Sequence, residues 1–223
     1  MARLTGPDDL HARPHAESRR SVTFGGLAIS YGPSVLPPRD WTTAQSEWAC
    51  QLLRDLPGGP ILELCAGGGQ IGLLAATLSG RQLVAVDLNP DAAACTRENA
   101  LRAGIPHLVD VRCCDMESAL TEHEAYPLIL ADPPWVPHGR IGDFPEDPPL
   151  AIDGGDDGLR LARACVRVID EHLRPDGAAL LQLGSGKQVD QLRRDLSAEG
   201  RDLAITDHRR YPRGELVLLE RDR

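Results

Sequence analysis

The sequence contains no apolar run as long as a membrane span, and its start, rich in Arg and His, lacks the apolar core of a signal peptide. Positive charge is also scarce, because 33 acidic residues against 24 Lys and Arg give a formal net charge of -9. Nucleic-acid binders obtain most of their affinity from basic side chains that neutralise phosphates, so this charge argues against such a partner. We therefore expect a cytoplasmic protein with no membrane partner.

Cysteine pairs with the spacing of metal ligands are missing as well. The six cysteines (positions 50, 65, 95, 113, 114 and 165) form no C-x-x-C pair and have no histidine at ligand spacing, so we predict no metal site. Most of them fall in apolar segments and are interpreted as small buried hydrophobic residues. Cys65 differs by its position, because it opens a glycine turn and could line a cofactor there.

The chain has no internal repeats or low-complexity tracts, and its 223 residues fit one large α/β domain. Residues 1–20 show no periodicity and are predicted to form a flexible arm, with a lid over the site as the alternative. The single domain then spans 21–223. Its first part is predicted as a short hairpin at 22–30 and a helix at 42–56.

From residue 60 onward, apolar runs alternate with helical patterns. The runs predict strands at 61–64, 83–86, 108–113, 126–131, 177–183, 203–206 and 216–219, and the patterns predict helices at 70–78, 89–103, 159–173 and 187–196. Residues 132–157, rich in proline and acids, are predicted as a long functional loop. We therefore predict an α/β fold with a single doubly wound, mainly parallel seven-stranded sheet and helices on both faces.

The segment 60–87 has the pattern of half a nucleotide-binding unit. Its first strand leads into the glycine turn 66–69, where absent side chains let the backbone approach a ligand closely. Its second strand ends at Asp87, where an acid can accept hydrogen bonds from both hydroxyls of a ribose. Gly67, Gly69 and Gly72 also satisfy G-x-G-x-x-G, so a dinucleotide-dependent oxidoreductase stays open on these residues alone.

Ligands of such sheets bind at the carboxyl ends of the strands, and an acid lies at or near the end of four successive predicted strands. Asp115 is predicted to accept from the amine of an adenine, or else to cap a helix. Met116 would cover the adenine face, or else fill the core. The candidate cofactor-binding residues are Glu63, Cys65, Ala66, Gly67, Gly69, Asp87, Leu88, Asp115, Met116 and Asp132.

The tetrapeptide Asp132-Pro133-Pro134-Trp135 follows the fourth predicted strand. Its prolines fix the backbone, so the Asp132 carboxylate and the Pro133 carbonyl are held ready to accept the hydrogens of a target nitrogen. Trp135 offers a flat wall for a planar or cationic group, or else it packs as apolar cover. Asp132, Pro133 and Trp135 are therefore the candidate catalytic residues, and Asp132 or His138 is the possible base for a cationic substrate.

The order and spacing of several segments resemble class I S-adenosylmethionine-dependent methyltransferases. The segments are ILELCAGGGQIGL, AVDLNPDAAACTRENA, Cys114-Asp115-Met116, LILADPPWVP and LRPDGAALLQLGSGKQ. Within that class the similarity, over about residues 22–200, is to the HemK-like release-factor glutamine methyltransferases, which carry an Asn-Pro-Pro-Tyr motif. The resemblance implies S-adenosyl-L-methionine as the cofactor, held by residues 65–69, Asp87, Met116 and Asp132. It also implies that residues 132–135 hold the target nitrogen.

Two departures from the HemK-like pattern leave the methyl acceptor open. HemK-like enzymes carry a helical N-terminal domain, whereas about 20 residues precede the similar region here, as in a shorter single-domain branch of the family. Asp132 also stands where the family has Asn, and an ionised Asp only accepts hydrogen bonds, whereas Asn also donates them. We therefore expect methyl transfer to a nitrogen of a small-molecule amine, with a protein glutamine amide as the alternative.

Other functions remain as further alternatives. Asp-Pro-Pro-Trp also resembles the motif of adenine amino-group methyltransferases, but the acidic charge argues against a nucleic-acid substrate. A non-catalytic module that has kept the cofactor pocket would show the same glycine turn and the same acid after the second strand.

Overall fold

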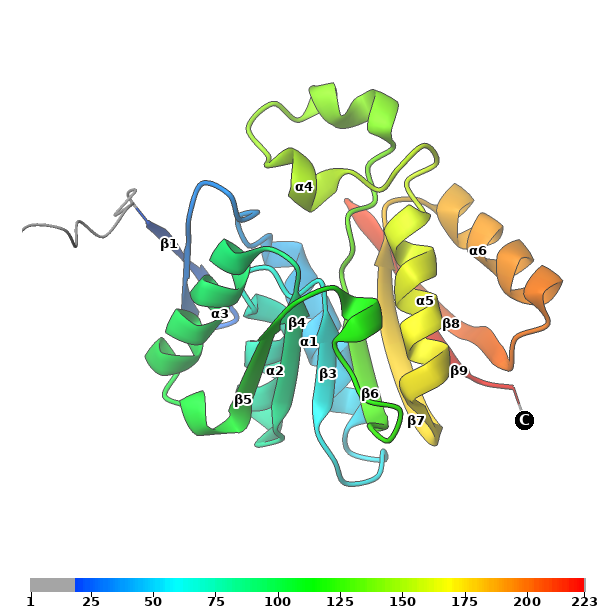
Figure 1. Ribbon diagram of the computed structural model, residues 1–223, viewed down its shortest axis with the longest axis horizontal. Helices are drawn as coiled ribbons and strands as arrows, with labels where there is room; N and C mark the ends of the chain where they lie inside the picture. Colours follow the sequence, from blue (N-terminus) through cyan, green and yellow to red (C-terminus); the bar gives the residue numbers. More distant parts are fainter. Residues whose placement is uncertain (1–18, 223) are drawn as a thin grey trace, which may run out of the picture.

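A central sheet of seven strands organises the computed structural model, which describes residues 19–222 (Figure 1). The strand order is β5-β4-β3-β6-β7-β9-β8. The five parallel strands are β3 (Ile61–Leu64), β4 (Leu83–Asp87), β5 (Val109–Cys113), β6 (Tyr126–Ala131) and β7 (Leu173–Leu183). β9 (Gly214–Arg221) lies antiparallel between β7 and β8 (Leu203–Tyr211). The prediction of a mainly parallel seven-stranded sheet is therefore confirmed.

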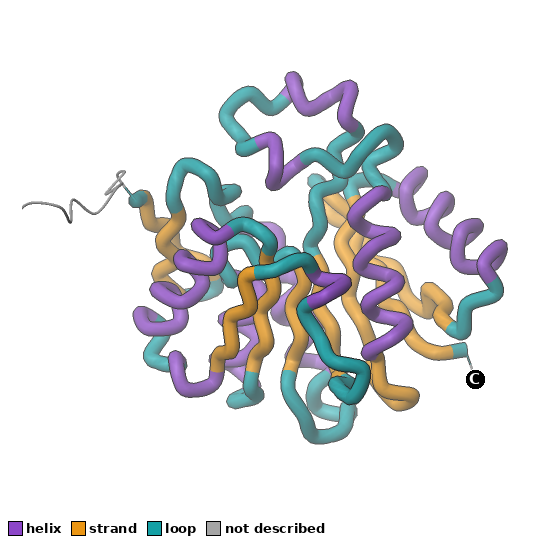
Figure 2. The backbone as a smooth tube through the Cα atoms, viewed as in Figure 1, coloured by secondary structure: helices purple, strands orange, loops and turns teal. Residues whose placement is uncertain are grey.

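Helices cover both faces of this sheet (Figure 2). α1 (Thr43–Leu52), α2 (Gln70–Ser79) and α3 (Pro90–Arg102) lie on one face, and α5 (Arg160–His172) and α6 (Gly186–Glu199) lie on the other. Successive strand residues point to opposite faces, so Ile61 packs under α1 and α2 while Leu62 and Leu64 pack under α5. Strands buried on both sides are apolar without alternation, which is why the sequence shows them as continuous apolar runs.

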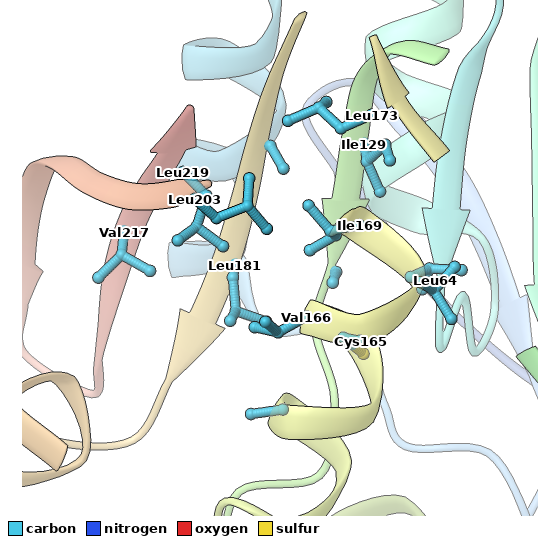
Figure 3. Packing of buried hydrophobic residues seen from close by; sticks show 14 of the residues in the cluster. Leu64, Ile129, Cys165, Val166, Ile169, Leu173, Leu181, Leu203, Val217 and Leu219 are labelled. Atoms are coloured by element: carbon cyan, nitrogen blue, oxygen red, sulfur yellow. The ribbon is translucent and has the colours of Figure 1, made fainter. Parts of the chain in front are cut away.

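The face under α5 shows how the helix pattern matches the sheet (Figure 3). Cys165, Val166 and Ile169 lie on one side of α5 and are almost fully buried against the sheet. Their partners on the strands include Ile129 and Leu181. Ile169 follows Cys165 by four positions and Val166 by three, and both spacings bring side chains to the same surface of a helix.

The segments that precede the sheet are a hairpin and a short helix. β1 (Arg20–Phe24) pairs with β2 (Leu27–Tyr31), which confirms the predicted hairpin. Arg20 thus belongs to a strand, and residues 1–18 of the predicted arm lie outside the described residues. α1 ends at Leu52, before the predicted Leu56, because the chain turns toward Pro57.

Other predicted boundaries also differ from the structure. β7 begins at Leu173 instead of 177, because Leu173 pairs with Tyr126 and a register shift accommodates the Arg-Pro-Asp-Gly stretch that follows. β8 and β9 form a much longer hairpin than predicted, since an edge strand tolerates the polar run at 206–210. The segment 132–157 contains a 3₁₀ helix (His138–Asp143) and α4 (Pro149–Ile152), and it rises above the sheet in Figure 1.

Within residues 19–222, no helix is both long and apolar enough to cross a membrane.

Candidate active site

The turn after β3 is built by backbone conformations that require glycine. Gly67 and Gly69 have φ angles of 56° and 75°, in the left-handed region. Cys65 also lies there, at φ 56°, and it is the one non-glycine residue of the described chain with a positive φ. Strain of this kind gathers at functional sites, where the surroundings hold it in place.

Two buried side chains of α3 hold the turn from behind. The Thr96 hydroxyl donates to the carbonyl of Gly67 (2.9 Å), and Asn99 Nδ2 donates to the carbonyl of Gly68 (2.8 Å). Asn99 also exchanges hydrogen bonds with the backbone of Ser30 in β2. A Cβ on Gly69 would lie 2.6 Å from Thr96, so the turn and α3 fit together only with glycine at this position.

Asp87, at the end of β4, faces the turn across the pocket floor. Its Oδ2 accepts the N–H of Gly67 (2.7 Å) and its Oδ1 accepts the N–H of Asn89 (2.8 Å). Burial raises the pKa of Asp87, and these two hydrogen bonds oppose that rise. The backbone thus orients a carboxylate whose remaining lone pairs are available to two hydroxyl groups.

Glu63 lies beneath the turn, where its side chain connects β3 to α2. Its Oε1 accepts the N–H of Gly72 in α2 (2.9 Å), while its Oε2 has no partner among the described residues. Gly72 allows this contact, because a Cβ there would lie 2.4 Å from Oε2. Burial raises the pKa of Glu63 to about 8. The predicted cofactor role of Glu63 thus has no support in its position, since its side chain does not line the pocket.

A pocket opens over the carboxyl ends of β3, β4, β5 and β6, with about 940 Å³ of empty space including its mouth. The predicted residues that line it are Cys65, Gly67, Asp87, Leu88, Asp115, Met116 and Asp132. Leu88 is 60% exposed and Leu150 of α4 is 63% exposed, and both line this pocket. Exposed leucines at a pocket mouth are suited to cover an apolar or aromatic group.

Asp115 and Met116, shortly after β5, line the pocket and also have structural contacts. Asp115 Oδ1 accepts the N–H of Glu117 (2.9 Å), so the residue caps a short 3₁₀ helix and still lines the pocket. Met116 lies on the pocket wall and also packs on the core, with its sulfur 3.7 Å from Sγ of Cys165.

The predicted tetrapeptide is split between the pocket and a supporting layer. Asp132 and Pro134 line the pocket, whereas the Trp135 ring packs against Gly184, where a Cβ would lie 2.2 Å from it. Gln188 of α6 holds this arrangement, since its Nε2 donates to the carbonyls of Trp135 (2.9 Å) and Asp157 (3.2 Å). Its Oε1 accepts the N–H of Gly184 (2.8 Å). The observed position of Trp135 agrees with apolar packing.

The other predicted residues that do not line the pocket are Pro133, Ala66 and Gly69. Ala66 is buried and donates its N–H to the carbonyl of Val86 (3.1 Å), so it shapes the turn from within. His138 is also outside the pocket, is exposed, and lies 2.8 Å from Asp153 through its Nδ1. That position offers no route for His138 to act as a base at Asp132.

Segments far apart in the sequence complete the pocket. Its further lining residues are Ser34, Val35, Leu36, Gln70, Val86, Asn89, Ala92, Cys114, Leu150, Ala151 and Leu161. The segment after β2 and the 132–157 insertion are joined by Arg39, whose Nη2 lies 2.6 and 2.8 Å from the carboxylate oxygens of Asp147. Both segments are rich in proline, which restricts the backbone and so favours an ordered conformation. The sequence did not indicate that the two segments lie next to each other.

The chemistry of the lining fits S-adenosylmethionine. Asp87 would accept from the ribose hydroxyls, and Leu88 and Met116 would cover the adenine, whose amine Asp115 could reach at the rim. Gln70 Oε1 is buried at the first turn of α2 with no partner among the described residues, so it offers an unused acceptor to the amino group of the cofactor.

Known methyltransferases resemble this chain in sequence and in structure. Residues 45–143 match the family model described as methyltransferase small domain. The release factor glutamine methyltransferase of Moorella thermoacetica is 31% identical over 192 residues, which cover 83% of this chain and 68% of that relative. The ribosomal protein uL3 glutamine methyltransferase of Bradyrhizobium diazoefficiens is 33% identical over 134 residues, 58% of this chain and 42% of the relative.

The chain spans between 42% and 59% of the length of the first three curated relatives that it matches. Among solved structures, the ribosomal protein L11 methylase of Lactobacillus delbrueckii subsp. bulgaricus has a TM-score of 0.61 at 15% identity. That match covers 86% of this chain and 84% of the other chain, and it shows a common fold.

Proposed function

This chain belongs to the HemK-like group of class I S-adenosylmethionine-dependent methyltransferases, and on that premise we propose that it methylates the side-chain amide nitrogen of a glutamine in a protein. The observation that supports this most directly is the position of Asp132. It lines the same pocket as Asp87 and follows the strand next to β3. Relatives are named for glutamine methylation, so we now favour the amide over the small-molecule amine that the sequence alone suggested.

The cofactor side of the pocket would bind S-adenosylmethionine through the turn at 65–69 and through Asp87. When bound, the cofactor supplies an electrophilic methyl group on a sulfonium. The backbone hydrogen bonds to Asp87 hold its carboxylate in one orientation before the ligand arrives, which lowers the cost of ordering on binding.

The acceptor side would hold the nitrogen through Asp132 and the carbonyl of Pro133. The residue before Asp132 is anchored from behind, because Nε2 of the buried Gln45 donates to the carbonyl of Ala131 (3.2 Å) at the end of β6 and to that of Leu180 (3.0 Å) within β7. Catalysis would come mainly from holding the nitrogen in line with the methyl carbon. A fixed β6 end and a proline-stiffened loop suit that task, since small displacements of reacting atoms reduce the rate strongly.

A second groove beside the pocket favours a polypeptide as the substrate. Val35 lines both the pocket and this groove, which runs between the hairpin and the insertion. Its remaining walls are Arg20, Tyr31, Gly32, Pro33, Pro37, Glu146 and Pro148. Proline and tyrosine surfaces of this kind would receive an extended chain, and we place the residues that flank the target glutamine here.

The test is methylation of purified proteins with methyl-labelled S-adenosylmethionine, read by mass spectrometry. We expect a methyl group on one glutamine of a release factor or of ribosomal protein uL3, the substrates named for the relatives. Asp132→Ala should lose this activity and still bind S-adenosylhomocysteine. Methylation restricted to a panel of small amines, with no glutamine modified, would contradict the proposal.

A further inference from the structure

The two acids that face each other across the pocket have opposite surroundings. Both oxygens of Asp87 accept backbone N–H groups. The carboxyl of Asp132 has no hydrogen-bond donor and no ion-pair partner among residues 19–222. Asp132 is partly buried in the pocket wall, so its carboxylate loses part of its solvation by water and no donor of the described residues replaces it, which disfavours the charged form.

No positive charge near Asp132 offsets this loss. The titratable groups near it are the Cys65 thiol in the turn and Asp87 on β4, which line the pocket, and Glu63 on β3, which lies outside the pocket beneath the turn. Farther along the same wall, the end of β5 adds Cys114 and Asp115. Beyond Asp132 itself, the segment 132–157 and α5 contribute only the apolar residues Pro134, Leu150, Ala151 and Leu161 to the pocket. Every charged neighbour is therefore negative, which also favours the neutral form of Asp132.

We propose that Asp132 binds the target glutamine in its protonated form, as a two-point partner that donates to the amide oxygen and accepts from the amide nitrogen. This inference rests on the proposed function. A neutral carboxyl has one O–H donor and one C=O acceptor side by side, which is the donor and acceptor pair that a primary amide also presents. The raised pKa of Asp132, about 7, agrees with the geometry. A carboxylic acid could then recognise an amide at neutral pH.

The protonated form also balances the proton that methylation releases. The amide nitrogen forms the new C–N bond while the electron pair of the S–CH₃ bond returns to the sulfur. Nitrogen then carries one hydrogen too many, and that proton passes to the C=O oxygen of Asp132 as the O–H proton of Asp132 passes to the amide oxygen. Loss of this last proton to water restores the amide carbonyl and leaves Asp132 neutral, ready for the next turnover.

An ionised Asp132 would behave differently toward the two candidate substrates. It would still accept from the nitrogen, but its second oxygen would face the amide oxygen, and two acceptors side by side repel each other. An amine has no such oxygen and would favour the ionised acid. The direction of the pH dependence therefore separates an amide substrate from an amine substrate.

The experiment compares pH profiles of kcat/KM for a glutamine peptide, using wild type, Asp132→Asn and Glu63→Gln. We expect the wild-type value to fall about tenfold for each pH unit above neutrality, because one essential proton is lost. Asp132→Asn should show a flat profile, since its amide keeps donor and acceptor at every pH. Glu63→Gln removes the neighbouring buried acid outside the pocket and leaves Asp132 in place, so kcat/KM should still fall above neutrality, and the shift of the midpoint measures the influence of Glu63 on Asp132. A wild-type profile that rises through neutrality to a plateau would overturn the proposal.

A second readout does not depend on turnover. With carbon-13-labelled aspartate, the infrared difference between wild type and Asp132→Asn at about pH 6 should contain the C=O stretch of a protonated carboxylic acid. Its absence would refute the protonated form directly. If the band is present and no glutamine is methylated at any pH, the glutamine assignment fails and takes the two-point pairing with it.

Discussion

Replacing Glu63 by glutamine should make the protein more stable at alkaline pH relative to the wild type. Glu63 is 2% exposed, its Oε2 has no partner within the described chain, and burial raises its pKa from the ordinary 4.5 to about 8. The folded protein therefore binds this proton more tightly than the unfolded chain does. The contribution of Glu63 to stability is complete below the unfolded pKa and is lost as pH rises toward the folded pKa.

The size of the effect follows from the same shift. One pKa unit corresponds to about 1.4 kcal/mol, so the wild type should lose about 3 kcal/mol relative to Glu63→Gln between about pH 5.5 and about pH 8. Glutamine keeps the acceptor for the Gly72 N–H and carries no charge at any pH, so it imitates the protonated acid. At low pH, the difference in the free energy of unfolding between the two proteins reports only on packing. The prediction concerns how this difference changes with pH.

Urea denaturation at several pH values, followed by circular dichroism, measures the free energy of unfolding of both proteins. Glu47→Gln is the matched control, because it makes the same chemical change on the exposed side of α1, where the side chain keeps its water in both states. Its difference from the wild type should stay constant. A constant difference for Glu63→Gln as well would show that the buried acid titrates alike in both states, and the reasoning about its burial would be wrong.

Two further predictions concern cofactor affinity and the support of the site. Asp87→Asn should weaken binding of S-adenosylmethionine roughly tenfold in calorimetric titration, since the ribose hydroxyls lose a charged acceptor; unchanged affinity would place the ribose elsewhere. Gln188→Leu should lower the free energy of unfolding by about 3 kcal/mol and reduce kcat, because the main-chain groups of Gly184, Trp135 and Asp157 lose their partner. Gln191→Leu should change both values little, because the Gln191 side chain bonds only to the side chains of Arg194 and Asp195 on the same helix and to no main-chain group. Equal effects of the two glutamine variants would refute the support role.

Local pattern was sufficient for the parts of this protein that depend on backbone periodicity and chain distance. Apolar runs predicted the bounds of β3 and β6 without error, because strands buried on both faces cannot carry polar residues. The glycines after β3 and the acid about 20 residues later predicted the pocket floor, since a short turn and one helix bring the ends of β3 and β4 together. The motif at 132–135 indicated the chemistry for a similar reason, because the parallel strand β6 lies next to β3.

The tertiary structure alone decided which side chains enter the pocket and which support it. Glu63 and Asp132 are both acids near strand ends, but Glu63 lies beneath α2 and Asp132 lines the pocket. Gly72 could have indicated the position of Glu63 from the sequence, because the third glycine of such a motif is typical of a helix that packs closely on a strand. The partners of Trp135 are Gly184, directly after β7, and Gln188 of α6, about 50 residues farther along the chain. Such contacts depend on how elements distant in sequence pack, whereas sequence periodicity describes only one element at a time.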